Sequence, residues 1–405
     1  MLPLLESLRR RFSKQILLIV VGPLVLFTLS ALLYLNTKTT TIFGSTSAKQ
    51  QTTAINNNPS SASFLNSSKR LLKSPANSTL GFQKLFYINL DTRYDLEDMI
   101  QLQSDVAGIT PDLWPARKIE PNSFKGLPPA SDDWPSKVAL GLLGCLRSHA
   151  DIWRATLKEK WETVLILEAD AAWDIHVREM MAHFSKGFQE ALPALSALNI
   201  TDSPMAPHGK PGDYVPTEND PYMAKHWDIL QLGGCFEKKE RAEFKHVYFD
   251  PTAHRKPIPY ADGSELGSHE RAIRWQNELM CTTAYAITPT GARKLLLRMS
   301  LQLNTPVDGL ISELVREDKL RAYSTTPNVF IQWQYRDGLG SNNKNSDISK
   351  FNPGDDASQE ARNRMWALAR KEMKIWQYNG IFGMSGFLHP ALGGQAEQLY
   401  GIVPS

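Results

Sequence analysis

The hydrophobic pattern divides the chain into three parts. Ile16–Leu35 is an unbroken uncharged and largely apolar run, residues 36–80 are mostly polar, and from residue 81 short apolar runs alternate with longer amphipathic stretches. Unbroken runs of four to six apolar residues predict strands buried on both faces, and apolar positions spaced by three or four residues predict helices. Alternating strands and helices predict an α/β fold in which crossover helices cover a sheet.

The same pattern predicts the individual elements of the third part. We predict strands at 85–90, 164–167, 227–233 and 282–287, and further strand and loop at 323–336. We predict helices at 96–102, 141–157, 180–198, 288–299, after residue 308, and at 356–376. The stripe Ala361, Met365, Ala369, Met373 and Trp376 in the last helix is expected to pack in the core. The proline-rich residues 110–137 and residues 201–222 are predicted as loops, and the polar residues 236–270 as a long active-site loop.

The first apolar run has the length of a membrane span, since about 20 residues cross a bilayer core. Arg9, Arg10, Arg11 and Lys14 precede it. The positive-inside rule then predicts a type II anchor, with residues 1–15 as a cytosolic tail and the remainder in the lumen. A cleaved signal peptide is the alternative, and the length of the run favours the anchor.

The polar residues 36–80 are predicted to form a flexible luminal stem, because they have too few large apolar residues to build a core. N-glycosylation acceptors occur at Asn66, Asn77 and Asn199. The three cysteines, Cys145, Cys235 and Cys281, lack the spacing of a zinc finger. One disulfide in an oxidising lumen and three buried small side chains are both compatible with the sequence.

Two acids follow the apolar run Val164–Leu167. Glu168 and Asp170 are two positions apart, so in an extended segment their side chains point the same way and Ala169 points elsewhere. Acids at the carboxyl end of a buried strand lie where open α/β sheets bind ligands. Two hard oxygen ligands suit Mn²⁺ or Mg²⁺ bound to a diphosphate. Solvated acids at the end of a strand are the plainer interpretation.

Several other function classes are disfavoured. The net charge of +3, without a long basic patch, gives no indication of a nucleic-acid partner. The phosphate-binding G-x-x-x-x-G-K-[ST] and G-x-G-x-x-G motifs, the G-x-S-x-G nucleophile elbow and the H-E-x-x-H zinc motif do not occur in the expected contexts.

Several ordered blocks together resemble glycosyltransferase family 25, the lipopolysaccharide and procollagen galactosyltransferase group. They are Tyr87–Asp91 with Arg93, Gly144–His149 (G-C-x-x-S-H), Leu165–Asp170, Asp228–Gly233, Ala284–Ile287 with Gly291, Ala292 and Leu295, and Pro306–Asp308 with Pro327, Gln332 and Ser346–Ile348. The resemblance extends from about residue 85 to residue 348. It implies a eukaryotic type II membrane form with a GT-A-like, Rossmann-type nucleotide-sugar fold, a UDP-sugar donor and inversion at the anomeric carbon.

The chain departs from the family pattern at two positions. Ala169 replaces the middle acid of the family's E-D-D segment, and Leu96 stands where a second arginine is usual. If Glu168 and Asp170 bind the metal, the middle acid supports the site indirectly. The variant Ala169→Asp is then expected to raise activity modestly.

The resemblance and the chemistry together suggest roles for single residues. Glu168 and Asp170 are the metal candidates, with Mn²⁺ first and Mg²⁺ second. Asp308 is the first candidate for the base that takes the acceptor proton, although it could instead cap a helix, and Asp228 is the second. Donor-binding candidates are Asn89, Asp91, Arg93, Ser148, His149 and Gln332. His149 could equally be a satisfied helix histidine and Asn89 a turn residue. Trp227, Trp275 and Trp333 are expected in the core or at its rim.

The resulting hypothesis is a Golgi or ER enzyme with its catalytic domain at residues 81–350 and a helical extension at 351–405. It would transfer a hexose, with galactose first, from a UDP-sugar to a glycan or glycoprotein hydroxyl. The alternative is an inactive glycan-binding or scaffold protein of the same fold. A metal-dependent phosphohydrolase is a third class, and the sequence lacks the His/Asp cluster that it requires.

Overall fold

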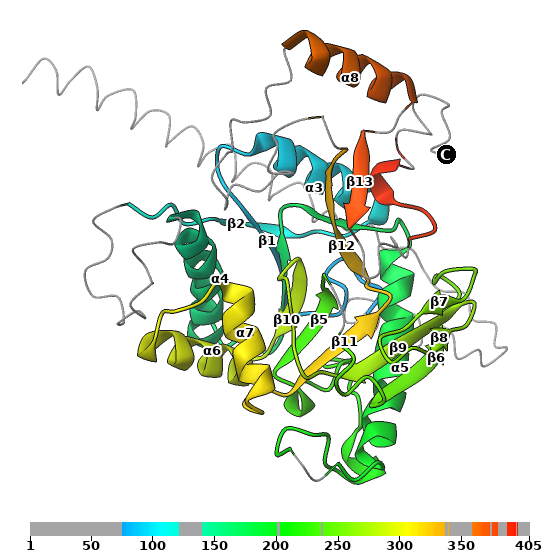
Figure 1. Ribbon diagram of the computed structural model, residues 1–405. Helices are drawn as coiled ribbons and strands as arrows, with labels where there is room; N and C mark the ends of the chain where they lie inside the picture. Colours follow the sequence, from blue (N-terminus) through cyan, green and yellow to red (C-terminus); the bar gives the residue numbers. More distant parts are fainter. Residues whose placement is uncertain are drawn as a thin grey trace, which may run out of the picture. The chain divides into compact units, whose positions relative to one another are not determined.

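The computed structural model describes residues 75–120, 140–200, 203–235, 238–336, 359–372, 375–379 and 387–393, with residues 339 and 395 (Figure 1). The predicted cytosolic tail, the predicted anchor Ile16–Leu35, most of the predicted stem, Asn66 and Ser346–Ile348 lie outside these ranges. Among the described residues, no helix has both the length and the apolar character needed to cross a membrane.

The described part of the chain forms a mixed α/β structure around one large sheet. Eight strands lie in the order β2 (Asp112–Pro115), β1 (Lys84–Asn89), β3 (Val164–Glu168), β10 (Ala284–Ile287), β5 (Ile229–Gly233), β11 (Ala322–Thr326), β9 (Glu270–Trp275) and β6 (Lys245–Phe249). Strands β2, β1 and β3 are parallel, and β10 runs antiparallel between β3 and β5. The predicted strands at 85–90, 164–167, 227–233 and 282–287 are confirmed within one or two residues at most ends.

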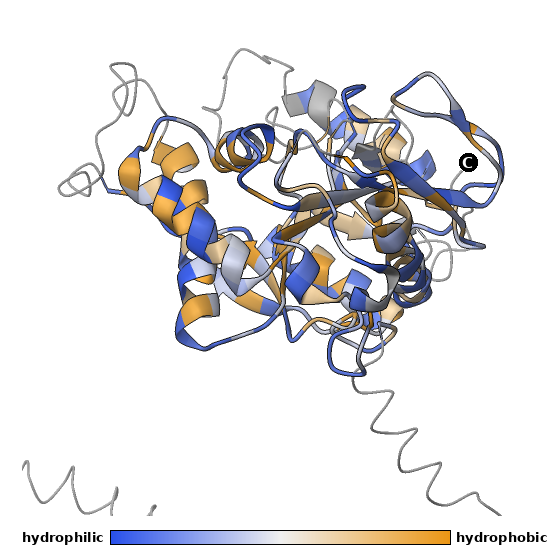
Figure 2. Ribbon diagram, turned by 90° about the horizontal axis from the view of Figure 1, so that it is seen from below, coloured by the Kyte–Doolittle hydropathy of each residue, from blue (hydrophilic) through white to orange (hydrophobic). Residues whose placement is uncertain are grey.

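Helices cover both faces of this sheet. Val164 and Ile166 of β3 pack in one apolar cluster with α4 (Leu140–Lys158), α6 (Pro289–Leu301) and α7 (Val307–Arg316). Leu165 and Leu167 pack in a second cluster, with α3 (Tyr94–Ala107) and α5 (Val177–Ser196). This arrangement explains why the β3 sequence is apolar without alternation. Figure 2 shows hydrophobic and hydrophilic residues alternating along the helices, as expected where one side faces a sheet.

A smaller antiparallel sheet lies beside the carboxyl end of β3. It consists of β4 (Ala171–Trp173), β12 (Phe330–Tyr335) and β13 (Trp376–Asn379). Gln332 of β12 pairs with Ala171 of β4, which places Gln332 next to Asp170. Two short strands, β7 (Ile258–Pro259) and β8 (Glu265–Leu266), form a separate pair, and short 3₁₀ turns occur at Pro211–Asp213 and Ala224–His226.

Two of the predicted loops are wrong in part, and residues 121–137 of the first lie outside the described ranges. Residues 112–115 form the edge strand β2. Residues 238–270 contain β6, at the far edge of the large sheet, and the separate pair β7 and β8. Strands β2 and β6 are the two edge strands of the large sheet, and their sequences, DLWP and KHVYF, lack the unbroken run of four apolar residues that marks a central strand. The segment 236–270 is therefore not an active-site loop next to β3.

The last predicted helix is shorter than expected. Helix α8 covers Gln359–Glu372, and Trp376 begins β13 instead of extending the helix. Ala369 is buried as predicted, whereas Met365 is 37% exposed. The predicted core stripe therefore holds for only part of the helix.

The antiparallel direction of β10 decides what lies near the acids at the end of β3. Ala284, the first residue of β10, pairs with Leu167 on one side and Gly233 of β5 on the other. The segment 281–283 that precedes β10 therefore lies at the carboxyl end of β3. The residues that follow β5 reach the same edge.

Candidate functional site

Glu168, the last residue of β3, points toward α4. It follows Val164 and Ile166 at two-residue intervals, and these residues face the α4 side of the sheet. The Thr282 hydroxyl donates to Glu168 Oε1 at 2.6 Å. His149 Nε2 lies 3.6 Å from the same oxygen. A carboxylate held by one hydroxyl beside an imidazole could hold a cation.

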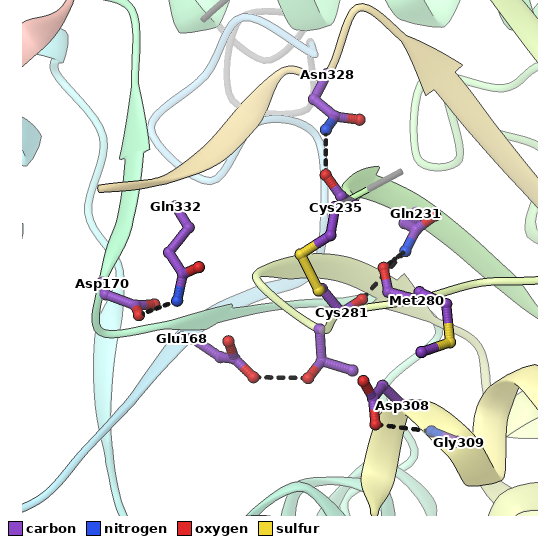
Figure 3. The surroundings of a disulfide bond; sticks show 12 residues. Glu168, Asp170, Gln231, Cys235, Met280, Cys281, Asp308, Gly309, Asn328 and Gln332 are labelled. Atoms are coloured by element: carbon purple, nitrogen blue, oxygen red, sulfur yellow. Dashed lines mark hydrogen bonds between the residues drawn. A yellow bond between two sulfur atoms is a disulfide. The ribbon is translucent and has the colours of Figure 1, made fainter. Parts of the chain in front are cut away.

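Asp170 lies in the turn between β3 and β4. Its Oδ2 accepts a hydrogen bond of 2.6 Å from Gln332 Nε2 (Figure 3). Its Oδ1 is buried and has no hydrogen-bond partner among the residues that the structure describes. Burial, and then the negative charge of Glu168, raise the pKa of Asp170 to about 7. A buried carboxylate oxygen without a partner, beside a second acid, fits a divalent cation as the missing partner.

Ala169 points to the other side of the sheet from Glu168. It is 6% exposed and belongs to the same apolar cluster as Leu165 and Leu167. The predicted alternation of side chains is therefore confirmed for this residue, although Ala169 also contributes to the wall of the neighbouring cavity.

A cavity of about 370 Å³ opens at the carboxyl ends of β1 and β3. Both acids line it, as do four of the predicted donor-binding residues. These four are Asn89, Ser148, His149 and Gln332. Arg117 and Lys118 from the segment after β2 give the cavity a basic side. A cavity with acids at its base and cations at its rim suits a phosphate-containing ligand bound with a cation.

Two predicted donor-binding residues lie outside the lining of this cavity. Asp91 is mostly exposed and pairs with Lys118 at 2.5 Å, which lowers the pKa of the Asp91 carboxyl. Arg93 binds Asp95 through two contacts of 2.8 Å. Asn89 donates to the Arg93 carbonyl at 2.9 Å and so closes the turn after β1. Asp91 therefore holds Lys118 at the rim, and Asn89 shapes the turn as well as the cavity wall.

The G-C-x-x-S-H block forms the α4 wall of the cavity. The Ser148 hydroxyl donates to the Gly144 carbonyl and accepts from Arg117 N, both at 2.7 Å. A Cβ atom on Gly144 would lie 2.5 Å from the Arg117 carbonyl oxygen, so only glycine allows this approach. The glycine and the serine of the block thus attach the segment after β2 to α4.

The sequence reasoning missed several residues that position this wall. Asp151 is buried and pairs with Arg117 at 2.5 Å and with Arg147 at 2.7 Å. The Tyr285 hydroxyl lies 2.9 Å from His149 Nδ1 and accepts from Trp153 Nε1 at 2.9 Å. Tyr285 lies inside the A-Y-x-I block, which was the one available signal. The contacts of Tyr285 with His149 and Trp153 span 136 and 132 positions, so local spacing could not reveal them.

A second cavity of about 160 Å³ contains Asp308 and adjoins the first. Cys145, Glu168 and Gln332 line both cavities. Asp308 is in the first turn of α7, where its Oδ1 accepts from Gly309 N at 2.8 Å. The N-cap of α7 is Pro306, so Asp308 is not the helix cap.

The prediction of Asp228 as a second candidate base is wrong. Asp228 precedes Ile229, which pairs through Ile287 with Val164, and so it lies at the edge of the sheet opposite to Glu168. It is fully buried and pairs with Lys294 at 2.6 Å and Arg321 at 2.9 Å. Burial opposes ionisation of Asp228, but these two cations keep the pKa of its carboxyl below the ordinary value. Asp228 therefore holds Lys294 and Arg321 together at that edge of the sheet, away from both cavities.

The structure also places the predicted tryptophans, two of the glycosylation acceptors and the cysteines. Trp227, Trp275 and Trp333 are buried in the core and not at a sugar-binding surface. Asn199 is exposed after α5. Asn77 Oδ1 accepts from the backbone of Thr79 and Gly81 in a turn before β1.

Cys235 and Cys281 form a disulfide, and Cys145 is a free thiol. Burial, and then the charges of the nearby acids, raise the pKa of Cys145.

Two comparisons with known proteins are consistent with this site. Residues 82–204 match the family model described as glycosyltransferase family 25 (LPS biosynthesis protein). A protein of Drosophila melanogaster named glycosyltransferase 25 family member is 28% identical over 120 residues, which are 27% of this chain and 20% of that protein. The chain therefore spans about a fifth of the length of this relative. The matched residues of the family model include β1, α4, β3 and both acids, and they confirm the resemblance to family 25.

Proposed function

We propose that this chain, which has a glycosyltransferase family 25 region at residues 82–204, transfers a hexose from a UDP-sugar to a hydroxyl of a glycan or glycoprotein. Galactose is the first candidate for the hexose. The proposed fold is GT-A-like, and transfer proceeds with inversion at the anomeric carbon. The proposed location is the Golgi or ER membrane, with a single type II anchor and the catalytic domain in the lumen.

One observation carries this proposal. Two cavities meet at Glu168, one of them basic at its rim and the other containing Asp308. A sugar transferase needs a donor site and an acceptor site that meet at the anomeric carbon. The larger cavity, with Arg117 and Lys118, suits the nucleotide diphosphate, and the smaller one suits the acceptor hydroxyl.

The chain's own residues fit a divalent cation. Glu168 and Asp170 would hold Mn²⁺, or Mg²⁺ as the alternative, and Gln332 and Thr282 orient their carboxylates. A cation bound there neutralises charge on the departing diphosphate. Arg117 and Lys118 add positive charge at the same cavity.

Asp308 is the proposed general base. Its carboxylate lies in the smaller cavity, and one oxygen is committed to Gly309 N at 2.8 Å. The other oxygen would accept the proton of the acceptor hydroxyl as that hydroxyl attacks the sugar from the face opposite to the leaving group.

The test is release of UDP from a panel of UDP-sugars by the full-length protein. We expect turnover with Mn²⁺, none with a chelator, and a loss of at least about 100-fold in kcat for Asp308→Asn. The matched control is Asp105→Asn, which removes an exposed carboxylate from α3 and should change nothing. Equal rates with and without a divalent metal would contradict the proposed metal site.

Ala169 favours a second candidate function, an inactive glycan-binding or scaffold protein of the same fold. In that case UDP-sugar would bind without turnover in the natural protein, and only Ala169→Asp would be active. Calorimetric binding together with the turnover assay separates the two candidates.

A further inference from the structure

The geometry points to a second, softer metal site formed by Cys145, His149 and Glu168, which takes Zn²⁺ or a similar thiophilic cation. The ligand atoms of the three side chains lie within 4.8 Å of one another. Cys145 and His149 are four positions apart on α4, so they face the same direction, and Glu168 approaches them from β3. Thiolate, imidazole and carboxylate are the ligand types that zinc prefers.

The geometry needs little adjustment to bind a cation. Zinc bonds of about 2.0–2.3 Å hold tetrahedral ligands about 3.3–3.8 Å apart. His149 Nε2 and Glu168 Oε1 are already 3.6 Å apart. The remaining separations, all within 4.8 Å, need to shorten by up to about 1.5 Å, which side-chain rotation can supply. All three residues line the larger cavity, of about 370 Å³, so a water or ligand there can complete the coordination.

Two neighbours already orient the proposed ligands. The Tyr285 hydroxyl lies 2.9 Å from His149 Nδ1, which fixes the ring and turns Nε2 toward Glu168. The Thr282 hydroxyl donates to Glu168 Oε1 at 2.6 Å. Such partners on the far side of a ligand are typical of metal-binding histidines and carboxylates.

This site differs in chemistry from the site of Glu168 and Asp170. Two carboxylates are hard ligands that suit Mn²⁺, whereas a thiolate and an imidazole select Zn²⁺. Glu168 belongs to both, so the two cations compete for it. Zn²⁺ binding exchanges the Cys145 thiol proton for the metal and releases that proton to solvent. If the proposed function holds, Zn²⁺ therefore inhibits transfer.

The cobalt spectrum tests this site without any assay of turnover. The sequence has three cysteines, and Cys235 and Cys281 are joined, so a thiolate–cobalt charge-transfer band reports Cys145 alone. We expect full-length protein with Co²⁺ to show this band and Zn²⁺ to remove it. We expect Cys145→Ser to lack the band and Asp170→Asn to retain it, because Asp170 belongs only to the harder site.

Alkylation of the wild-type protein gives a second test that needs no folded variant. Zn²⁺ should slow modification of the Cys145 thiol by a maleimide at least about 10-fold, and Mn²⁺ at the same concentration should not, because thiolates prefer zinc. No cobalt band in the wild type, a band that survives in Cys145→Ser, loss of the band in folded Asp170→Asn, or equal protection by both metals would overturn the proposal. Because neither readout uses a sugar nucleotide, failure of this site leaves the proposed transferase activity to its own test.

Discussion

At the residue scale, the site depends on hydrogen bonds that hold two acids in place. Glu168 and Asp170 each have one short contact, from Thr282 and Gln332 respectively. Burial and the neighbouring negative charge of Glu168 also raise the pKa of Asp170. If the proposed metal site is correct, removing either hydrogen bond should weaken metal binding more than it destabilises the fold.

Thr282→Val tests this dependence. The substitution keeps the shape of the side chain and removes the hydroxyl that donates to Glu168 Oε1. Loss of such a partner typically weakens metal binding about 10–100-fold. We expect the Mn²⁺ concentration for half-maximal activity to rise by this factor, and Thr282→Ser to restore the wild-type value. A normal metal titration for Thr282→Val would show that the hydroxyl does not position Glu168.

Ala169→Asp tests the side of the sheet to which residue 169 belongs. An aspartate there would enter an apolar cluster with Leu165 and Leu167, at a cost of about 1–3 kcal/mol in the free energy of unfolding. We expect a lower unfolding temperature, a rise in activity of at most about 10-fold, and an unchanged Mn²⁺ titration. A large gain in Mn²⁺ affinity would show that this acid is a ligand.

At the scale of elements, the Gly144 contact joins α4 to the segment after β2. Gly144→Ala places a Cβ atom 2.5 Å from the Arg117 carbonyl, and so pushes Arg117 and Lys118 away from the cavity. We expect the KM for the UDP-sugar to rise about 10-fold or more, with little change in Mn²⁺ affinity. Gly212→Ala is the matched control, because nothing lies within 4 Å of its Cβ position. Equal KM values for the two variants would contradict this role of Gly144.

The sequence predicted central elements better than edges. Strands β1, β3 and β5 are largely buried on both sides, so their apolar runs were visible in the sequence. Strands β2 and β6 were missed because these edge strands mix polar and apolar residues and contain no run of four apolar residues.

The site itself was predictable only where the chemistry is local. Glu168 and Asp170 are two positions apart, and both line one cavity as this spacing predicts, although Asp170 lies in the turn after β3. Asp228 was misassigned because its partners, Lys294 and Arg321, are 66 and 93 positions away. Thr282 was missed because its place beside Glu168 depends on the antiparallel direction of β10, which an apolar run does not reveal.

At the scale of the whole molecule, buried ion pairs set the response to acid. Burial alone would raise the pKa of Asp228, but Arg321 and Lys294 lower it below the ordinary value, and Arg271 does the same for Asp250. The native state then binds fewer protons than the unfolded chain just below pH 4, so the stability that these acids contribute is lost as the pH falls through their native pKa values.

We therefore expect the free energy of unfolding in urea to decrease below about pH 4. Asp228→Asn should be less stable by about 1–3 kcal/mol at neutral pH, because it leaves the half-buried Lys294 and Arg321 without a counter-charge. It should also show a weaker acid dependence than the wild type. The mutant of the exposed Asp105 serves as the control, and an equally steep acid dependence in both variants would contradict the assignment.

The disulfide between Cys235 and Cys281 is expected to contribute both to the stability of the fold and to the geometry of the site. Cys235 follows β5 and Cys281 precedes Thr282, so the bond ties the carboxyl end of β5 to the segment that holds Glu168 (Figure 3). A cross-link over 46 residues restricts the unfolded chain by about 4 kcal/mol in the loop-entropy treatment. We expect the double variant Cys235→Ala and Cys281→Ala to lose roughly 2–4 kcal/mol and to bind Mn²⁺ more weakly.

Reductant provides the control for this prediction, since it should weaken the wild type toward the variant and leave the stability of the variant unchanged. Loss of stability with an unchanged Mn²⁺ titration would show that the disulfide supports the fold but not the placement of Thr282. The converse result, weaker Mn²⁺ binding at full stability, would show that the bond acts locally on the segment 281–283. Both effects are expected together, because only Thr282 and Thr283 separate Cys281 of the disulfide from the first residue of β10. Loss of the disulfide should therefore also change the position of Thr282.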